Sequence, residues 1–148
     1  MENILLAYIG IALLAGGSFA ASAVAAAICG RTAIGAMKKK PDALGTYFIL
    51  SALPLTQGLY GFVGFILLRS FLVAEVTLVQ ACAIFGVGLI MAAVGFIASI
   101  GQARICANGI EATASGHNVV APTMIMAVLP ELYAIFALLV TILTSFVI

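Results

Sequence analysis

Glu131 is the residue of this chain whose position most directly suggests chemistry. It lies in the middle of the last apolar stretch, residues 121–147, and that stretch contains no other charged side chain. Because a charge in the hydrocarbon of a membrane is energetically costly, an ionisable side chain there is by default a candidate functional group. A carboxylate can bind a proton or a cation and release it again, so we take Glu131 as a candidate ion-carrying group.

Polar side chains also follow one face of the second apolar stretch, residues 43–68. Leu53, Thr56, Gln57 and Tyr60 recur at the i, i+3, i+4 and i+7 spacing of one helix face. The last three carry side-chain oxygens, and an unsatisfied polar group at membrane depth costs several kcal/mol. These side chains therefore need partners, which could belong to another helix or be an ion.

One proline lies within the polar face of residues 43–68, and another lies beside Glu131. Pro54 cannot donate a hydrogen bond to the carbonyl of Leu50, so it distorts the preceding turn and lets a carbonyl such as that of Leu53 turn toward a ligand. Pro130 immediately precedes Glu131, and we expect it to have the same effect in the last helix.

Gln102, near the end of the third apolar stretch, adds a second amide oxygen. One carboxylate, two amide oxygens, a hydroxyl and a backbone carbonyl form the kind of oxygen cage that hard cations prefer. A monovalent cation leaves a cage with one negative charge neutral, whereas a divalent cation does not. Because a proton needs only the carboxylate, the additional oxygens favour Na⁺ over H⁺.

Two structural interpretations of the same residues remain open. The amides and the hydroxyl could merely hydrogen-bond between helices. Glu131 could pair with Arg104 or Arg69, although both lie near helix ends, where a long side chain reaches the membrane surface.

The elements that position these residues are membrane helices. The chain is 65% hydrophobic and only 7% charged, so it cannot present a water-compatible surface. About 20 apolar residues cross a bilayer as a helix. Four stretches are long enough: residues 4–30, 43–68, 78–103 and 121–147. This pattern predicts an all-α membrane protein without a soluble domain, and the net charge of +1 gives no indication of nucleic acid.

Charge predicts how the four helices are oriented. The segments after the first and third helices, 31–42 and 104–120, share one side of the membrane and carry Arg31, Lys38, Lys39, Lys40 and Arg104. The opposite side carries only Arg69. The positive-inside rule therefore predicts that loops 31–42 and 104–120 are cytoplasmic and that both termini lie outside.

The two halves of the sequence resemble each other. Residues 19–29 align without a gap with residues 96–106, with identical residues at six of the eleven positions. Residues 54–60 align with residues 130–136, each segment beginning at a proline. The chain is thus predicted to be a duplicated helical hairpin.

The first hairpin comprises residues 1–68 and the second comprises residues 69–148, and only the second carries the membrane carboxylate. In residues 15–30, twelve of sixteen residues are Gly, Ala or Ser. Small residues let membrane helices approach closely, so the first and third helices are expected to form a tightly packed inner layer.

Residues 54–61, Pro-Leu-Thr-Gln-Gly-Leu-Tyr-Gly, resemble the Pro-Glu-Thr-Gln-Ala-Ile-Tyr-Gly signature of the proteolipid rotor subunits of V-type and A-type rotary ATPases. Leu55 stands at the position of the glutamate. The duplicated form with one carboxylate in the last helix is similar to the K proteolipid, the counterpart of the c-ring proteolipids, in bacterial Na⁺-transporting V-type ATPases. The resemblance covers essentially the whole chain and implies assembly into a rotor ring.

The resemblance also implies a site. The family's Na⁺ ligands fall at the Leu53 carbonyl, Thr56, Gln57, Gln102 and Glu131, and Tyr60 falls where a tyrosine hydrogen-bonds the carboxylate. All six positions carry matching residue types. Pro130 departs from the family pattern and is expected to alter the local helix geometry.

The implied function is ion translocation by a homo-oligomeric ring turning in membrane lipid. Each Glu131 would exchange its ion with a stationary membrane subunit that has an essential Arg, and central-stalk subunits would contact the cytoplasmic loops. The chain has no phosphate-binding glycine loop followed by Lys, so ATP hydrolysis is expected on other subunits, and no organic cofactor is implied.

Three other interpretations remain open at this point. The ring could carry protons. The chain could instead be a small four-helix exporter of cations or drugs, although the absence of Trp does not favour an aromatic lining for a bulky cation. A structural tetraspan protein would leave Glu131 and the internal repeat without a role.

Overall fold

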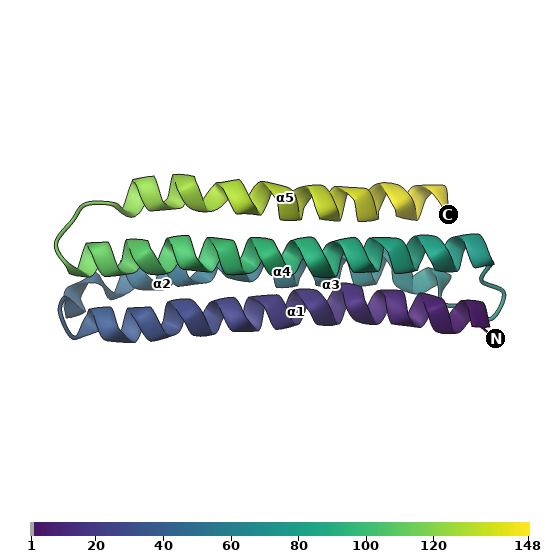
Figure 1. Ribbon diagram of the computed structural model, residues 1–148, viewed down its shortest axis with the longest axis horizontal. Helices are drawn as coiled ribbons and strands as arrows, with labels where there is room; N and C mark the ends of the chain where they lie inside the picture. Colours follow the sequence, from purple (N-terminus) through teal and green to yellow (C-terminus); the bar gives the residue numbers. More distant parts are fainter. Residues whose placement is uncertain (1) are drawn as a thin grey trace.

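The computed structural model describes residues 2–148 and contains helices joined by short turns. The four long rods of Figure 1 are α1 (Glu2–Met37), a second rod made of α2 (Leu44–Ala52) and α3 (Thr56–Leu68), α4 (Leu78–Ala114) and α5 (Val120–Val147). Short 3₁₀ turns at Pro41–Ala43, Leu53–Leu55 and Arg69–Phe71 precede, divide and end the second rod. All four rods are long and apolar enough to cross a membrane, which confirms the predicted all-α, four-span architecture.

The predicted extents of loops 31–42 and 104–120 are wrong. α1 continues to Met37 and α4 to Ala114, so the turns between rods comprise only a few residues. Arg31 and Arg104 end the apolar stretches but are good helix formers, and nothing directly after them breaks a helix. At about 1.5 Å per residue, the 36 residues of α1 span about 54 Å, whereas the hydrocarbon core is about 30 Å thick.

Local signals fix both ends of α4. At its start, the Thr77 hydroxyl accepts a hydrogen bond from the Gln80 amide while the Gln80 side chain accepts one from the Thr77 amide, forming a capping box. At its end, Gly116 adopts φ 93°, and the amide of His117 donates to the Ala112 carbonyl. This left-handed glycine cap stops the helix and lets the chain reverse into α5.

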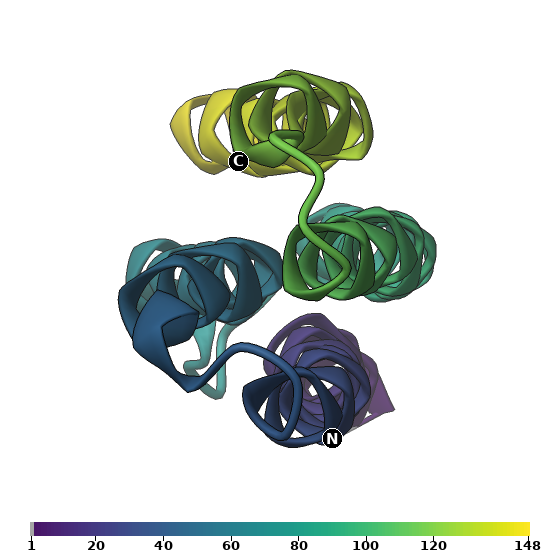
Figure 2. The same cartoon turned by 90° about the vertical axis from the view of Figure 1, so that its left-hand side faces the viewer.

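Close approach of backbones joins the two halves. A Cβ added to Gly88 would collide with the backbone of Gly10, and one added to Gly17 would collide with Ala92. α1 and α4 therefore pack side by side through small residues, and the second rod and α5 lie on one side of this pair, which we call the outer side (Figure 2). The second rod also approaches α1 through glycines, since Gly61 faces Ser18.

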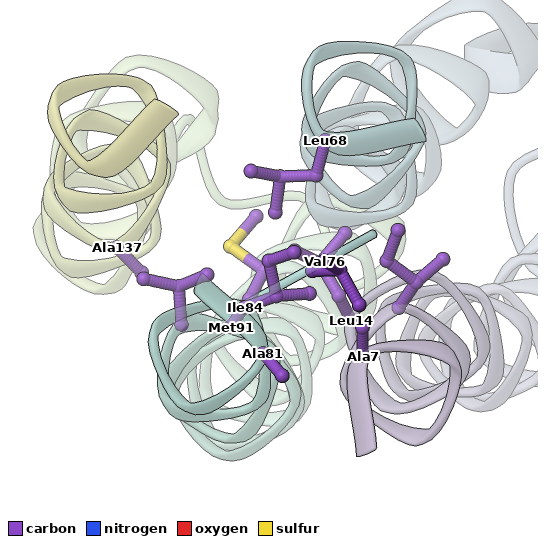
Figure 3. Close-up of a cluster of buried hydrophobic side chains, with 10 residues drawn as sticks. Ala7, Leu14, Leu68, Val76, Ala81, Ile84, Met91 and Ala137 are labelled. Atoms are coloured by element: carbon purple, nitrogen blue, oxygen red, sulfur yellow. The ribbon is translucent and has the colours of Figure 1, made fainter. Parts of the chain in front are cut away.

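Two apolar clusters fill the bundle. The first, near the ends that carry the termini, includes Leu14, Leu68, Ile84 and Met91 (Figure 3). The second, toward the opposite end, is built from Ala25, Cys29, Tyr47, Leu50, Ala103, Cys106, Ile110 and other small or apolar residues. The middle of the bundle, between these clusters, is where the polar side chains meet.

Both termini lie at one end of the bundle, and the α1–α2 and α4–α5 connections lie at the other (Figure 1). This agrees with the predicted pairing of loops, while the assignment of either end to the cytoplasm stays a prediction. The hairpin boundary between residues 68 and 69 also stays a prediction.

Candidate ion-binding site

A break in the second rod positions one side of the site. The helix changes to a 3₁₀ turn at Leu53–Leu55, around Pro54, and resumes as α3 at Thr56. The predicted distortion at Pro54 is therefore present. The expectation of the same effect at Pro130 is wrong, because α5 continues unbroken through that proline.

The difference between the two prolines has a structural reason. At Pro54, the hydroxyls of Ser22 from α1 and Ser99 from α4 hydrogen-bond backbone groups of the turn and of Gly58 just after it. Around Pro130, the part of the chain that the structure describes supplies no side-chain hydrogen bond of this kind. A proline removes one helix hydrogen bond, and without polar groups to stabilise an alternative geometry, α5 remains helical.

Glu131 of α5 points into the space between α3 and α4 and receives hydrogen bonds from four neutral side chains. Its Oε2 accepts from the Thr56 hydroxyl at 2.8 Å, from Gln102 Nε2 at 2.8 Å and from Gln57 Nε2 at 3.3 Å. Its Oε1 accepts from the Tyr60 hydroxyl. Neutral donors do not balance the charge that a carboxylate carries when it is ionised, so this arrangement leaves room for a cation or a proton to balance it.

The site lies deep in the bundle. The side chains of Gln57 and Gln102 are 0% and 1% exposed, while Glu131, Thr56 and Tyr60 are partly buried. Tyr60 packs against the first apolar cluster, and Leu53 packs against the second. The polar layer is thus enclosed on both sides along the bundle axis by side chains that exclude water.

One polar atom of the site has no partner. Gln57 Nε2 donates to Gln102 Oε1 at 2.9 Å, but Gln57 Oε1 is buried and, among residues 2–148, accepts no hydrogen bond. Leaving a buried acceptor unpaired costs about 1–3 kcal/mol. The oxygen and nitrogen of an amide exchange places when it turns by half a rotation, so both glutamines can present an oxygen toward Glu131.

The Leu53 carbonyl completes the group. It accepts from the Thr56 backbone amide and lies 3.1 Å from the Thr56 hydroxyl oxygen, which has a single proton to share between this carbonyl and Glu131. The Thr56 hydroxyl thus contacts both this carbonyl and Glu131, and it brings the two oxygens close together. Within residues 2–148, no three His, Cys, Asp or Glu side chains gather, so neutral oxygens make up the rest of this donor set.

The structure thus brings together all six residues that the sequence singled out. Arg104 and Arg69, the suggested ion-pair partners, are exposed, and Glu131 instead accepts from the four neutral side chains. Ser22 and Ser99 were missed. They occupy matching positions in the internal repeat, which is the signal that could have identified them.

Comparison with known proteins identifies a matching family and similar proteins. The family model for the C subunit of ATP synthase matches twice, at residues 9–68 and at residues 85–144. The chain is 33% identical to A-type ATP synthase subunit K of Methanocaldococcus jannaschii over 97% of its own length, and it spans 63% of the length of that protein. It is 32% identical to V-type sodium ATPase subunit K of Enterococcus hirae, over 81% of this chain and 77% of that protein.

The two family matches cover most of the chain and divide it into the two hairpins that the internal repeat predicted. Each match contains one inner helix and one outer rod, and the Glu131 carboxylate lies in the second match. This multi-pass membrane protein belongs to the family of the ATP synthase C subunit, as a duplicated proteolipid of the subunit K kind.

Proposed function

We propose that this chain is the rotor-ring subunit of a V/A-type rotary ATPase and carries Na⁺ across the membrane on Glu131. The observation that supports this most is the single buried carboxylate surrounded by four neutral hydrogen-bonding side chains from α3 and α4. The relative from Enterococcus hirae, named as a sodium ATPase subunit, supports the choice of ion.

The donor set fits Na⁺. Gln57, whose buried Oε1 has no partner among residues 2–148, donates to the carboxylate, and the Leu53 carbonyl contacts the Thr56 hydroxyl that also contacts the carboxylate. With Na⁺ bound, the amides of Gln57 and Gln102 would turn their oxygens to the ion, and the Tyr60 hydroxyl would keep its hydrogen bond to Glu131. A proton needs only the carboxylate and at most one acceptor, so it would not use the amide oxygens of Gln57 and Gln102 together with the Leu53 carbonyl.

Neutralisation of the site allows rotation. A bare carboxylate facing lipid is costly, whereas an ion-occupied site carries no net charge and can pass through hydrocarbon. In this proposal a stationary membrane subunit supplies the ion pathways and an Arg that helps displace the ion. Soluble subunits carry out the ATP chemistry, and this chain does not.

The surface of α4 and α5 supports assembly with further copies. A groove of about 660 Å³ between these helices is lined by Thr123, Met126, Pro130, Tyr133 and residues of α4. Met126 is 54% exposed and Tyr133 is 66% exposed. A second hollow, of about 380 Å³, continues the groove past the same Pro130 and Tyr133.

The internal repeat indicates what covers this groove. When Pro54 is aligned with Pro130, Met126 corresponds to Leu50 and Tyr133 to Gln57, and both of these are fully buried against α4 of the second hairpin. The second hairpin therefore leaves open the face that the first hairpin buries. A second copy would cover it with its own α1, and repetition of this contact would close a ring.

We further propose that the α1–α2 and α4–α5 connections face the cytoplasm, where central-stalk subunits would contact them, and that both termini lie outside. Lys38, Lys39 and Lys40, in and beside the first connection, support this orientation.

The test of ion identity uses a hydrophobic carbodiimide, which reacts with protonated carboxyls in apolar surroundings and should label Glu131. Bound Na⁺ keeps the carboxylate deprotonated, so Na⁺ should protect it, and more strongly at higher pH because fewer protons compete. K⁺ at equal concentration is the control. Labelling that ignores Na⁺ at every pH would contradict a Na⁺ site and favour a proton-carrying ring.

A further inference from the structure

We propose that Ser22 and Ser99 are positioning residues of the ion site. They hold the 3₁₀ turn at Leu53–Leu55 in the shape that directs the Leu53 carbonyl and the Gln57 side chain toward the ion. This inference rests on the proposed function. It extends that function to two further residues, because neither serine belongs to the group that surrounds Glu131.

The turn leaves backbone groups that need partners from outside its own helix. Pro54 has no amide hydrogen, so the usual bond to the Leu50 carbonyl is absent, and the change from α to 3₁₀ geometry alters the bonds that follow. Leaving backbone groups unpaired in an apolar environment costs free energy. Neighbouring donors and acceptors that can reach these groups therefore stabilise the turn.

Ser99 supplies one partner from α4. Its hydroxyl donates to the Pro54 carbonyl at 2.8 Å, and its side chain is 0% exposed. A buried hydroxyl of this kind has few other partners within reach, so it fixes the direction of the Pro54 carbonyl.

Ser22 supplies the other partners from α1. Its Oγ accepts from the Gly58 amide at 2.8 Å and donates to the Leu55 carbonyl at 3.2 Å. A Cβ on residue 58 would lie 2.9 Å from this Oγ, so the glycine is what allows the hydroxyl to come so close.

The two hydroxyls thus hold the turn from two neighbouring helices. The backbone groups they bond belong to Pro54, Leu55 and Gly58, and the ion-site residues Leu53, Thr56 and Gln57 are interleaved with these three. Within the described residues, the hydrogen bonds of both serines go to this backbone and not to Glu131. They can affect the ion only through the position of the backbone that they bond.

The internal repeat supports a shared role. Ser22 and Ser99 occupy matching positions of the two hairpins, yet both bond the single turn at Pro54. Ser18, one turn before Ser22, is buried like Ser99 but donates to the Leu14 carbonyl of its own helix at 2.7 Å. It provides a matched control.

The experiment measures carbodiimide labelling of Glu131 in the membrane-embedded complex for the wild type, Ser22→Ala, Ser99→Ala and the control Ser18→Ala. Two quantities are taken: the Na⁺ concentration that halves the labelling rate, and the pH dependence of labelling without Na⁺. Native mass of the extracted assembly checks that each variant still assembles.

We expect the half-protecting Na⁺ concentration to rise about three- to tenfold in Ser99→Ala, which loses one hydrogen bond, and at least as much in Ser22→Ala, which loses two. The control should match the wild type. The pH dependence without Na⁺ should change less than the half-protecting Na⁺ concentration, because the serines do not touch the carboxylate and reach it only through neighbours such as Gln57. Ser99→Cys, which keeps a weaker donor, should give an intermediate value and replaces the alanine variant if that variant does not assemble.

An unchanged half-protecting concentration in both variants would overturn the inference. So would a parallel change in the pH dependence without Na⁺, because that would mean general loosening of the site. Failure of Na⁺ to protect the wild type would instead overturn the Na⁺ proposal, and this inference with it. The two failures are therefore distinguishable.

Discussion

At the scale of single residues, the central fact is that Glu131 accepts hydrogen bonds only from neutral donors in the region the structure describes. No neighbouring cation lies against it there, so in the proposed function a bound ion would balance its charge. The neutral ligands would then adjust the affinity for the ion, while the carboxylate would decide whether an ion binds at all.

Glu131→Gln should therefore abolish ion transport and transport-coupled ATP turnover while leaving assembly intact. The amide has nearly the same shape but carries no charge to attract a cation or a proton. Ion uptake into vesicles that contain the complex measures this, and native mass tests assembly. Substantial Na⁺ or H⁺ uptake by the variant would mean that another group carries the ion.

Thr56→Val should weaken Na⁺ binding by about 1–3 kcal/mol, because it removes a ligand hydroxyl and leaves its partners unpaired. Gln57 and Gln102 variants without the amide should behave similarly. Thr141→Val is the control, since that buried hydroxyl donates only to the Ala137 carbonyl of its own helix. Equal half-protecting Na⁺ concentrations in the Thr56 and Thr141 variants would mean that Thr56 is not a ligand of the ion.

At the scale of elements, the two prolines are the informative comparison. Pro54 lies in a 3₁₀ turn supported by two serines, whereas Pro130 lies inside a continuous helix. Only the first therefore changes the course of the backbone beside the proposed ion site.

Pro54→Ala should let the second rod continue as one α-helix and draw the Leu53 carbonyl into helix hydrogen bonding. We expect Na⁺ binding to weaken about tenfold, the effect of one strong hydrogen bond. Pro130→Ala should leave Na⁺ protection of Glu131 unchanged. If both variants behave alike, the turn at Leu53–Leu55 is not what presents the carbonyl.

Much of the fold and of the candidate site could be predicted from the sequence, for identifiable reasons. Helix periodicity put Leu53, Thr56, Gln57 and Tyr60 on one face, and the lone charge of Glu131 needed polar partners in an apolar bundle. The ends of α1 and α4 could not be predicted from hydropathy, because an arginine ends each apolar stretch without ending the helix. The turn at Pro54 and the continuous helix at Pro130 could not be predicted either, because they differ through tertiary contacts of Ser22 and Ser99.

At the scale of the whole molecule, the repeat leaves one face of the second hairpin uncovered. On α1, Ala26 corresponds to Ala103, which is 0% exposed between the two hairpins. In a ring, Ala26 would be buried in the same way against α4 of the preceding copy.

Ala26→Leu should overpack this contact between copies at a cost of about 1–3 kcal/mol and reduce the yield of intact rings. Ala27→Leu is the control, because Ala27 corresponds to the exposed Arg104 and faces neither neighbour. Native mass of the detergent-extracted protein measures assembly. Intact rings with Ala26→Leu, or a wild-type dimer in place of a ring, would contradict the proposed contact.

Equilibrium binding of radioactive Na⁺ to the purified assembly, compared between the wild type and Glu131→Gln, tests the proposed site most directly. We expect a single Na⁺ per chain in the wild type, displaced as the pH falls, and none in the variant. Absence of bound Na⁺ in the wild type, or equal binding in the variant, would contradict the claim that Glu131 and its neutral partners form the Na⁺ site.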